Sequence, residues 1–149
     1  MPTTFILQAK DIAKSIRRVF LSCNKEALIP WDDLTTAIQD GWCCAASAGL
    51  HLAQEADGLP WITLGTRMRD AYHTGAALPV SRDLNFLVGL SWEACARHLA
   101  NLMDPGDEPD LAGMEAYWPG WVHDKLAKIK EDVVLAPDGK MVTLTEDVP

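Results

Sequence analysis

The sequence predicts a mainly α-helical fold: a single-domain bundle of about five helices with a β-hairpin at its C-terminal end. Apolar residues recur at i, i+3 and i+4 spacing in five separate segments. Proline, glycine and short polar residues separate these segments, as they do between helices. After about residue 133 the pattern changes to short apolar runs around a Pro-Asp-Gly turn. A chain of 149 residues is long enough to bury one core.

The first predicted helix spans about residues 5–23. Its apolar stripe includes Ile12, Ile16 and Val19, which lie at helical spacing. Four basic residues are expected on the opposite, solvated face, where they could also meet an anionic partner: Lys10, Lys14, Arg17 and Arg18.

A Pro-Trp pair precedes both the second predicted helix, about 35–53, and the third, about 64–75. Proline pushes the residue before it into extended geometry, so Pro30 and Pro60 end a connection. The tryptophan that follows is expected to fold back on the first helical turn. Two copies of this pattern are too few for a repeat protein. We therefore interpret the similarity as two helices that begin with the same local sequence pattern. Small residues from Gly41 to Gly49 would let another helix approach closely.

The fourth predicted helix, about 82–103, is apolar on several sides, so we expect it to be central. An exposed acidic loop from Asp104 to Asp110 follows it. Pro119 is expected to open the fifth helix, about 119–131. The hairpin, about 133–144, is marginal alone and must pack on the helices or join a partner's sheet, which leaves a homo-oligomer open.

Charge and composition exclude some classes of function. The net charge of −8 argues against direct nucleic-acid binding, which needs a basic footprint. An acidic DNA mimic stays an alternative, although its carboxylates would have to stand in regular rows. No apolar run approaches the roughly 18 residues of a membrane span, and no signal peptide is visible. We therefore expect a cytoplasmic protein without membrane contact.

Cysteine and histidine residues are candidate metal ligands or catalysts. Cys95 and His98 lie about one turn apart, and either Cys43 or Cys44, together with His51, could complete a zinc site. These residues lie in apolar stripes, so we expect buried free thiols, no metal and no cofactor. A cysteine nucleophile would need a thiolate-stabilising setting that the sequence does not supply. A small hydrolase or transferase that uses His98 and Glu93 is kept as an alternative.

The six tryptophans are more informative, because aromatic faces beside arginine can bind a nucleotide or a peptide. Most stand at predicted helix starts, where a ring can be half exposed. We predict that Trp31, Trp61 and Trp118 contact the ligand or partner, with Arg67 as their polar neighbour. Trp42 and Trp121 are expected to belong to the core.

The segment Pro30-Trp31-Asp32-Asp33-Leu34, followed by Gln39, Trp42, Ala45-Ala46 and Leu50, resembles a pattern of small phage and prophage accessory proteins. It is also distantly similar to one half of the ryanodine-receptor repeat domain. Thr35, Thr36 and Ala37 replace the glutamates usual in that pattern. The resemblance implies a non-enzymatic intracellular accessory protein that binds a host protein or a nucleotide-like ligand. It transfers no catalytic residues.

Overall fold

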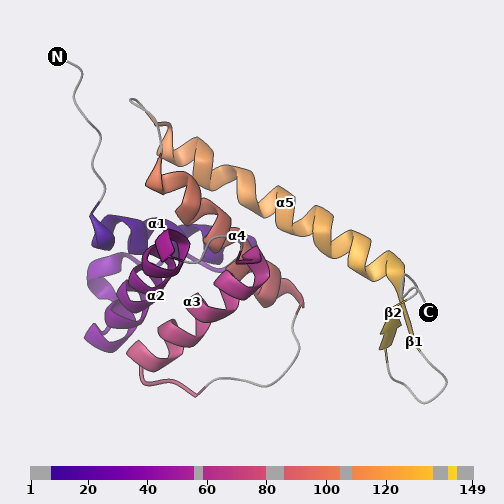
Figure 1. The fold of residues 1–149 in the computed structure, drawn as a ribbon, viewed down its shortest axis with the longest axis horizontal. Helices are drawn as coiled ribbons and strands as arrows, with labels where there is room; N and C mark the ends of the chain where they lie inside the picture. The colour runs from indigo at the N-terminus through magenta and orange to yellow at the C-terminus, as the bar shows by residue number, and fades with distance from the viewer. Residues whose placement is uncertain (1–7, 56–58, 80–85, 105–108, 136–140, 144–149) are drawn as a thin grey trace.

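The computed structural model describes residues 8–55, 59–79, 86–104, 109–135 and 141–143 (Figure 1). This part of the chain is mainly helical, as predicted. It contains five α-helices and one short 3-10 helix: α1 (Ala9–Cys23), η1 (Trp31–Asp33), α2 (Thr36–Glu55), α3 (Trp61–Gly75), α4 (Phe86–Met103) and α5 (Leu111–Asp132). Among the described helices, none is both long and apolar enough to cross a membrane.

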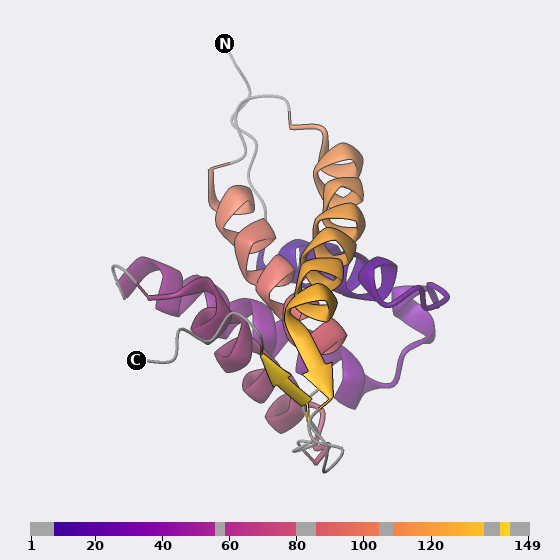
Figure 2. The same ribbon diagram turned by 90° about the vertical axis from the view of Figure 1, so that its right-hand side faces the viewer.

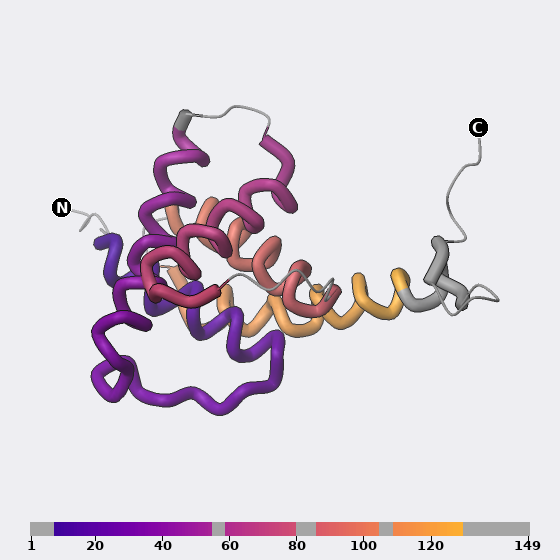
Figure 3. The backbone as a smooth tube through the Cα atoms, turned by 90° about the horizontal axis from the view of Figure 1, so that it is seen from below, coloured from indigo at the N-terminus to yellow at the C-terminus, as the bar shows by residue number. Residues whose placement is uncertain are grey.

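Helix α4 lies at the centre, which confirms the expectation from its wide apolar surface. It packs against α1, α2, α3 and α5 (Figure 2). Its buried side chains follow almost every turn: Ser91, Trp92, Ala94, Cys95, Ala96, His98, Leu99 and Leu102. Helix α5 crosses the body and then runs past the other helices (Figures 1 and 3).

Small residues bring α2 and α3 into close contact, as their composition predicted. A Cβ atom built on Gly75 would lie 3.0 Å from the Cα of Gly41 and 2.7 Å from Cys44 Sγ. A Cβ atom on Gly41 would meet the carbonyl oxygen of Tyr72 at 2.8 Å. Glycine is therefore required at both positions by the separation of the two helices.

An aromatic cluster joins the first four helices. Phe20, Trp42, Tyr72 and Trp92 come from α1, α2, α3 and α4, and their ring centroids lie 4.6–5.8 Å apart in five pairs. Trp42 is buried, which confirms its assignment to the core. Such ring pairs add to the stability gained from apolar burial.

The two Pro-Trp pairs start different elements. Trp31 opens the 3-10 turn η1, and α2 begins only after Thr35, whose Oγ1 accepts the Ile38 N–H at 3.3 Å. Trp61, in contrast, is the first residue of α3 itself. The two Pro-Trp pairs therefore mark similar turns in the chain, but they do not begin the same kind of helix.

The predicted start of the fifth helix at Pro119 is wrong. Helix α5 begins at Leu111, where Asp110 Oδ1 accepts the Gly113 N–H at 3.1 Å and caps the first turn. Pro119 lies inside the helix. Burial of Trp118 and Val122 on either side of this proline offsets the backbone hydrogen bond that it cannot make.

Several other predicted boundaries fall on residues that the structure does not describe. These include the start of the first helix at 5–7, the start of the fourth at 82–85, most of the acidic loop, and the turn at 136–140. Strands β1 (Val133–Leu135) and β2 (Met141–Thr143) pair antiparallel, with Val134 opposite Val142. Because the chain that joins them is not described, the hairpin stays a prediction, as does the single domain.

Candidate functional site

The four predicted contact residues occupy different environments. Trp61 is 38% exposed at the start of α3, and Arg67 is exposed further along it. Trp31 and Trp118 are only 9% and 5% exposed, so neither is the half-exposed ring that we expected. Within the described residues, no ring pair, hydrogen bond or cation–π contact joins any two of these four. The structure therefore does not assemble them into one site.

A different set of residues does form a cluster, which we call the aromatic surface: Trp61 of α3, Arg97 of α4, and Tyr117, Trp121 and Lys125 of α5. The Arg97 guanidinium carbon lies 5.4 Å from the Trp61 ring centroid and 5.2 Å from that of Trp121. Both distances are typical of cation–π contacts. One guanidinium thus links side chains of three helices.

Arg97 is held from a further side by Glu93, whose Oε2 accepts its Nε–H at 3.1 Å. The two residues lie four apart on α4, which is the spacing of neighbouring side chains on a helix. The Arg97 side chain still keeps 37% of its surface exposed. It is therefore fixed in position and accessible at the same time.

The rest of the aromatic surface lies on the outer side of α5. Tyr117 is 60% exposed, and the Lys125 ammonium lies 5.6 Å from the Trp121 ring centroid. A shallow hollow of about 300 Å³ is lined by Tyr117, Gly120, Trp121, Asp124, Lys125 and Lys128. Trp121 is half-buried, so its assignment to the core was correct for only part of the ring.

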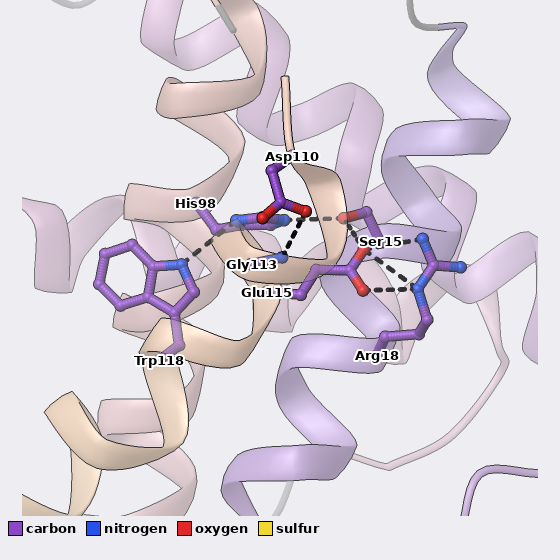
Figure 4. A network of polar contacts seen from close by, with 7 residues as sticks. All are labelled: Ser15, Arg18, His98, Asp110, Gly113, Glu115 and Trp118. Atoms are coloured by element: carbon purple, nitrogen blue, oxygen red, sulfur yellow. Dashed lines mark hydrogen bonds and ion pairs between the residues drawn. The ribbon is translucent and has the colours of Figure 1, made fainter. Parts of the chain in front are cut away.

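A polar network that is largely buried joins α1, α4 and α5 (Figure 4). Ser15 Oγ lies 2.7 Å from His98 Nε2 and 2.6 Å from Glu115 Oε2. Glu115 in turn accepts two N–H groups of Arg18 at 2.7–3.0 Å, and the Trp118 indole N–H lies 3.2 Å from His98 Nδ1. The network therefore runs from Trp118 to Arg18 without a gap.

Only one assignment of donors and acceptors satisfies all the hydrogen bonds of this network. An indole N–H can only donate, so His98 Nδ1 accepts and the ring proton lies on Nε2. His98 Nε2 then donates to Ser15 Oγ, and the Ser15 hydroxyl donates to Glu115. Burial lowers the pKa of His98 to about 4, partly offset by the Glu115 charge. The imidazole is therefore neutral at neutral pH.

This arrangement is structural in character, although serine, histidine and glutamate are the residues of many hydrolases. A base that activates serine must accept the hydroxyl proton, yet the accepting nitrogen of His98 faces Trp118. Ser15 and His98 are also fully buried. Glu93 is bound to Arg97, and no contact brings it to His98.

The cysteines do not form a reactive or metal-binding group in the described residues. Burial raises the pKa of Cys23 to about 12 and that of Cys95 well above its usual value. Cys95 Sγ donates to the Ile16 carbonyl at 3.3 Å. Burial and the Asp40 charge raise the pKa of Cys43. No cluster of three or more potential ligands occurs in the part of the chain that the structure describes.

The prediction that four basic residues lie on the outer face of the first helix is wrong for one of them, Arg17. Arg17 is only 5% exposed, and its Nη2 donates to the Ile29 carbonyl at 2.6 Å. Ser15 is likewise buried, because it takes part in the polar network. The apolar periodicity of the sequence could not predict the burial of these two side chains, because each is buried with a hydrogen-bond partner from another segment of the chain.

Comparison of the chain with protein-family models, with curated proteins and with solved structures gives no match. The arguments about function therefore rest on the geometry of the aromatic surface and of the buried network.

Proposed function

We propose that this chain is a non-enzymatic binding protein that takes a protein partner on its aromatic surface. One observation carries the proposal: the Arg97 guanidinium is held between the Trp61 and Trp121 rings while more than a third of its side chain stays exposed. Tryptophan, tyrosine and arginine are the residues that most often dominate the energy of a protein interface.

The geometry also supports tight binding because the surface is preorganised. Arg97 already contacts the two rings and Glu93 before any partner arrives. A partner would then order fewer side chains at the contact, and the entropic cost of association is smaller. Tyr117 adds an exposed ring with a hydroxyl group beside this clamp.

A nucleotide-like ligand is the second candidate, and it is favoured by the hollow beside Trp121. Lys125 and Lys128 line this hollow and could bind phosphate, while Asp124 could accept hydrogen bonds. A base that stacked on Trp121 would compete with Lys125, which already lies by the same ring together with Arg97. We therefore prefer a protein partner to a nucleotide-like ligand.

Two other functions receive less support. A hydrolase or transferase that uses His98 and Glu93 would need both side chains at one accessible site, whereas His98 is fully buried. An acidic DNA mimic would present rows of carboxylates, whereas the hollow beside Trp121 mixes Asp124 with Lys125 and Lys128.

The cellular setting of the proposal comes from the sequence resemblance. We propose an accessory protein of phage or prophage type that acts in the cytoplasm on a host protein. We also propose that β1 and β2 close into a hairpin that follows α5, and that the chain can self-associate through it.

The proposal is tested by capture of host proteins from a lysate with immobilised chain. Tyr117→Ala and Arg97→Ala should abolish the specific capture, whereas Leu78→Ala, at a 42% exposed apolar residue of another region, should keep it. Trp61→Ala and Arg67→Ala test two of the predicted contact residues directly. Circular dichroism of each variant separates loss of binding from loss of fold.

Two results would contradict the proposal. If Tyr117→Ala and Arg97→Ala capture the same proteins as the unmodified chain, the aromatic surface is not the contact. If ATP or GTP raises the melting temperature, and Lys125→Ala with Lys128→Ala removes that effect, the nucleotide-like ligand replaces the protein partner.

A further inference from the structure

We propose a second binding surface, the α1 groove, that takes a peptide segment of a partner protein carrying an acidic pair followed by apolar side chains. The groove consists of two adjoining hollows beside α1, between α5 and the connection from α1 to η1. Both hollows are lined by Arg18 and Leu28, so they lie next to each other.

The larger hollow is suited to apolar side chains. Its volume is about 220 Å³, and its walls are Arg18, Leu21, Ser22, Glu26, Leu28, Ala112, Glu115 and Ala116. The small side chains of Ala112 and Ala116 leave room beside the apolar Leu21 and Leu28. Glu115, one of two carboxylates in this lining, is already paired with Arg18. A leucine-sized side chain could therefore enter without leaving that charge unpaired.

The smaller hollow is suited to carboxylates. Its volume is about 80 Å³, and it is lined by Lys14, Arg17, Arg18, Leu28, Ile29, Pro30 and Trp31. Three of these residues are cationic and none is acidic. The Lys14 ammonium lies 5.9 Å from the Trp31 ring centroid, and among the described residues no carboxylate pairs with it. It is therefore available to an anion from outside.

The apolar rim of the groove is held in an exposed position. Leu28 is 56% exposed and Ile29 is 53% exposed, although they are large adjacent apolar residues. The buried Arg17 guanidinium donates to the Ile29 carbonyl at 2.6 Å and ties this connection to α1. A contiguous exposed apolar patch beside charged groups is typical of an interaction site.

Charge complementarity selects the occupant. The chain carries a net charge of −8, whereas the smaller hollow is lined by three cations and no carboxylate. Arg17 already donates to the Ile29 carbonyl and Arg18 to Glu115, so Lys14 is the cation that an acidic side chain would contact first. A free phosphate would use these cations but not Leu28 and Ile29. A purely apolar segment would use the rim but not Lys14. A peptide with both chemistries matches both hollows.

The α1 groove is independent of the aromatic surface. Its α5 residues are Ala112, Glu115 and Ala116, whereas the aromatic surface uses Tyr117, Trp121 and Lys125. Glu115 and Tyr117 are two residues apart and so lie on different sides of the helix. With both surfaces occupied, the chain would bring two partners together.

The test measures fluorescence anisotropy of the full chain with a library of labelled, capped peptides. Each peptide carries Asp-Glu and Leu-Leu at a varied spacing. Matched peptides carry Lys-Lys in place of the acids or Ser-Ser in place of the leucines. We expect saturable binding by at least one acidic peptide, and loss of about tenfold or more in affinity for both matched peptides.

Variants locate the binding on the chain. Leu28→Ser and Lys14→Ala should each weaken it by about tenfold, and Ala112→Phe should block the larger hollow. Leu78→Ser and Lys125→Ala are matched controls outside the groove and should bind normally, as should Tyr117→Ala, which tests the aromatic surface. Thermal unfolding confirms that the variants keep their fold.

The proposal is overturned if no acidic peptide binds, if the Lys-Lys peptides bind equally well, or if Leu28→Ser and Lys14→Ala leave binding unchanged. Sedimentation of the free chain adds one more outcome. A dimer that Leu28→Ser dissociates would make a second copy the occupant and would also overturn the assignment to a partner peptide. Each of these results leaves the test of the aromatic surface unaffected.

Discussion

The indole N–H of Trp118 donates to Nδ1 of His98 over 3.2 Å, and this contact fixes the tautomer of a fully buried imidazole. A protonated His98 would carry an N–H on Nδ1 that points at another N–H. The contact also fastens α5 to α4 through a side chain in the middle of α5. Protonation of His98 in acid would therefore break this contact and weaken the packing of α5 on α4.

Stability should fall between pH 6.5 and pH 4. The pKa of His98 is about 6.5 in the unfolded chain and about 4 in the folded one, so the unfolded state binds the extra proton in this window. The shift corresponds to roughly 3 kcal/mol of unfolding free energy, present above pH 6.5 and lost as pH falls to about 4. Urea unfolding at a series of pH values measures this loss.

The matched variant is His98→Gln, which does not titrate and keeps an amide donor for Ser15. Carboxylates also titrate in acid, so the informative quantity is the difference between the two pH profiles. Parallel profiles between pH 6.5 and pH 4 would mean that the pKa of His98 is not lowered in the folded chain.

A glycine pair tests the packing of α3 on α4. A Cβ atom on Gly65 would lie 2.8 Å from the Trp92 carbonyl carbon and oxygen, which are backbone atoms that cannot turn aside. We expect Gly65→Ala to cost about 1–3 kcal/mol. Gly89 of α4 has nothing within 4 Å of its Cβ position, so Gly89→Ala should be neutral or stabilising by up to about 1 kcal/mol. Equal thermal shifts in the two variants would refute the close approach.

Leu99 tests the position of α4 in the core. Its side chain is fully buried, and it is one of the groups that a Cβ atom on Gly49 would meet. Leu99→Ala should cost about 2–5 kcal/mol in urea unfolding. The exposed Leu78 is the control, and Leu78→Ala should stay within about 0.5 kcal/mol of the unmodified chain. A similar small loss at both positions would place α4 at the periphery.

Three of the four cysteines should differ clearly in their reaction with a maleimide. Cys44 is exposed and should react in the folded chain. Cys23 and Cys95 are buried thiols of raised pKa and should react only after addition of denaturant. Mass spectrometry of the labelled chain, with Cys44→Ser as control, identifies the fast site. Rapid labelling of Cys95 in the folded state would show that the centre of the bundle opens.

Helix content and the central place of α4 could be read from periodicity, because apolar spacing reports burial directly. The close contact of Gly41 with Gly75 was predictable in kind, since runs of small residues permit it. The start of α5 was not, because Pro119 is a stronger local signal than the Asp110 cap, and tertiary burial of Trp118 overrides it.

The candidate site was less predictable than the fold. Exposure of a tryptophan depends on what packs over it, so Trp31 and Trp118 could not be distinguished from Trp61 by position alone. The pairing of Arg97 with Trp61 and Trp121 joins three helices and has no local signature. Glu93 and Arg97, four residues apart, are the one part of the clamp that the sequence displays.

The clamp on Arg97 also limits how the chain can be shortened. Its two rings are supplied from α3 and from α5, and the guanidinium comes from the helix between them in sequence. A synthetic copy of α5 would display Tyr117 and Trp121 without the cation that orients them. An expressed fragment that ended before α5 would leave Arg97 with one ring instead of two. Any miniature that is meant to compete for the partner must therefore span the chain from Trp61 to at least Lys125.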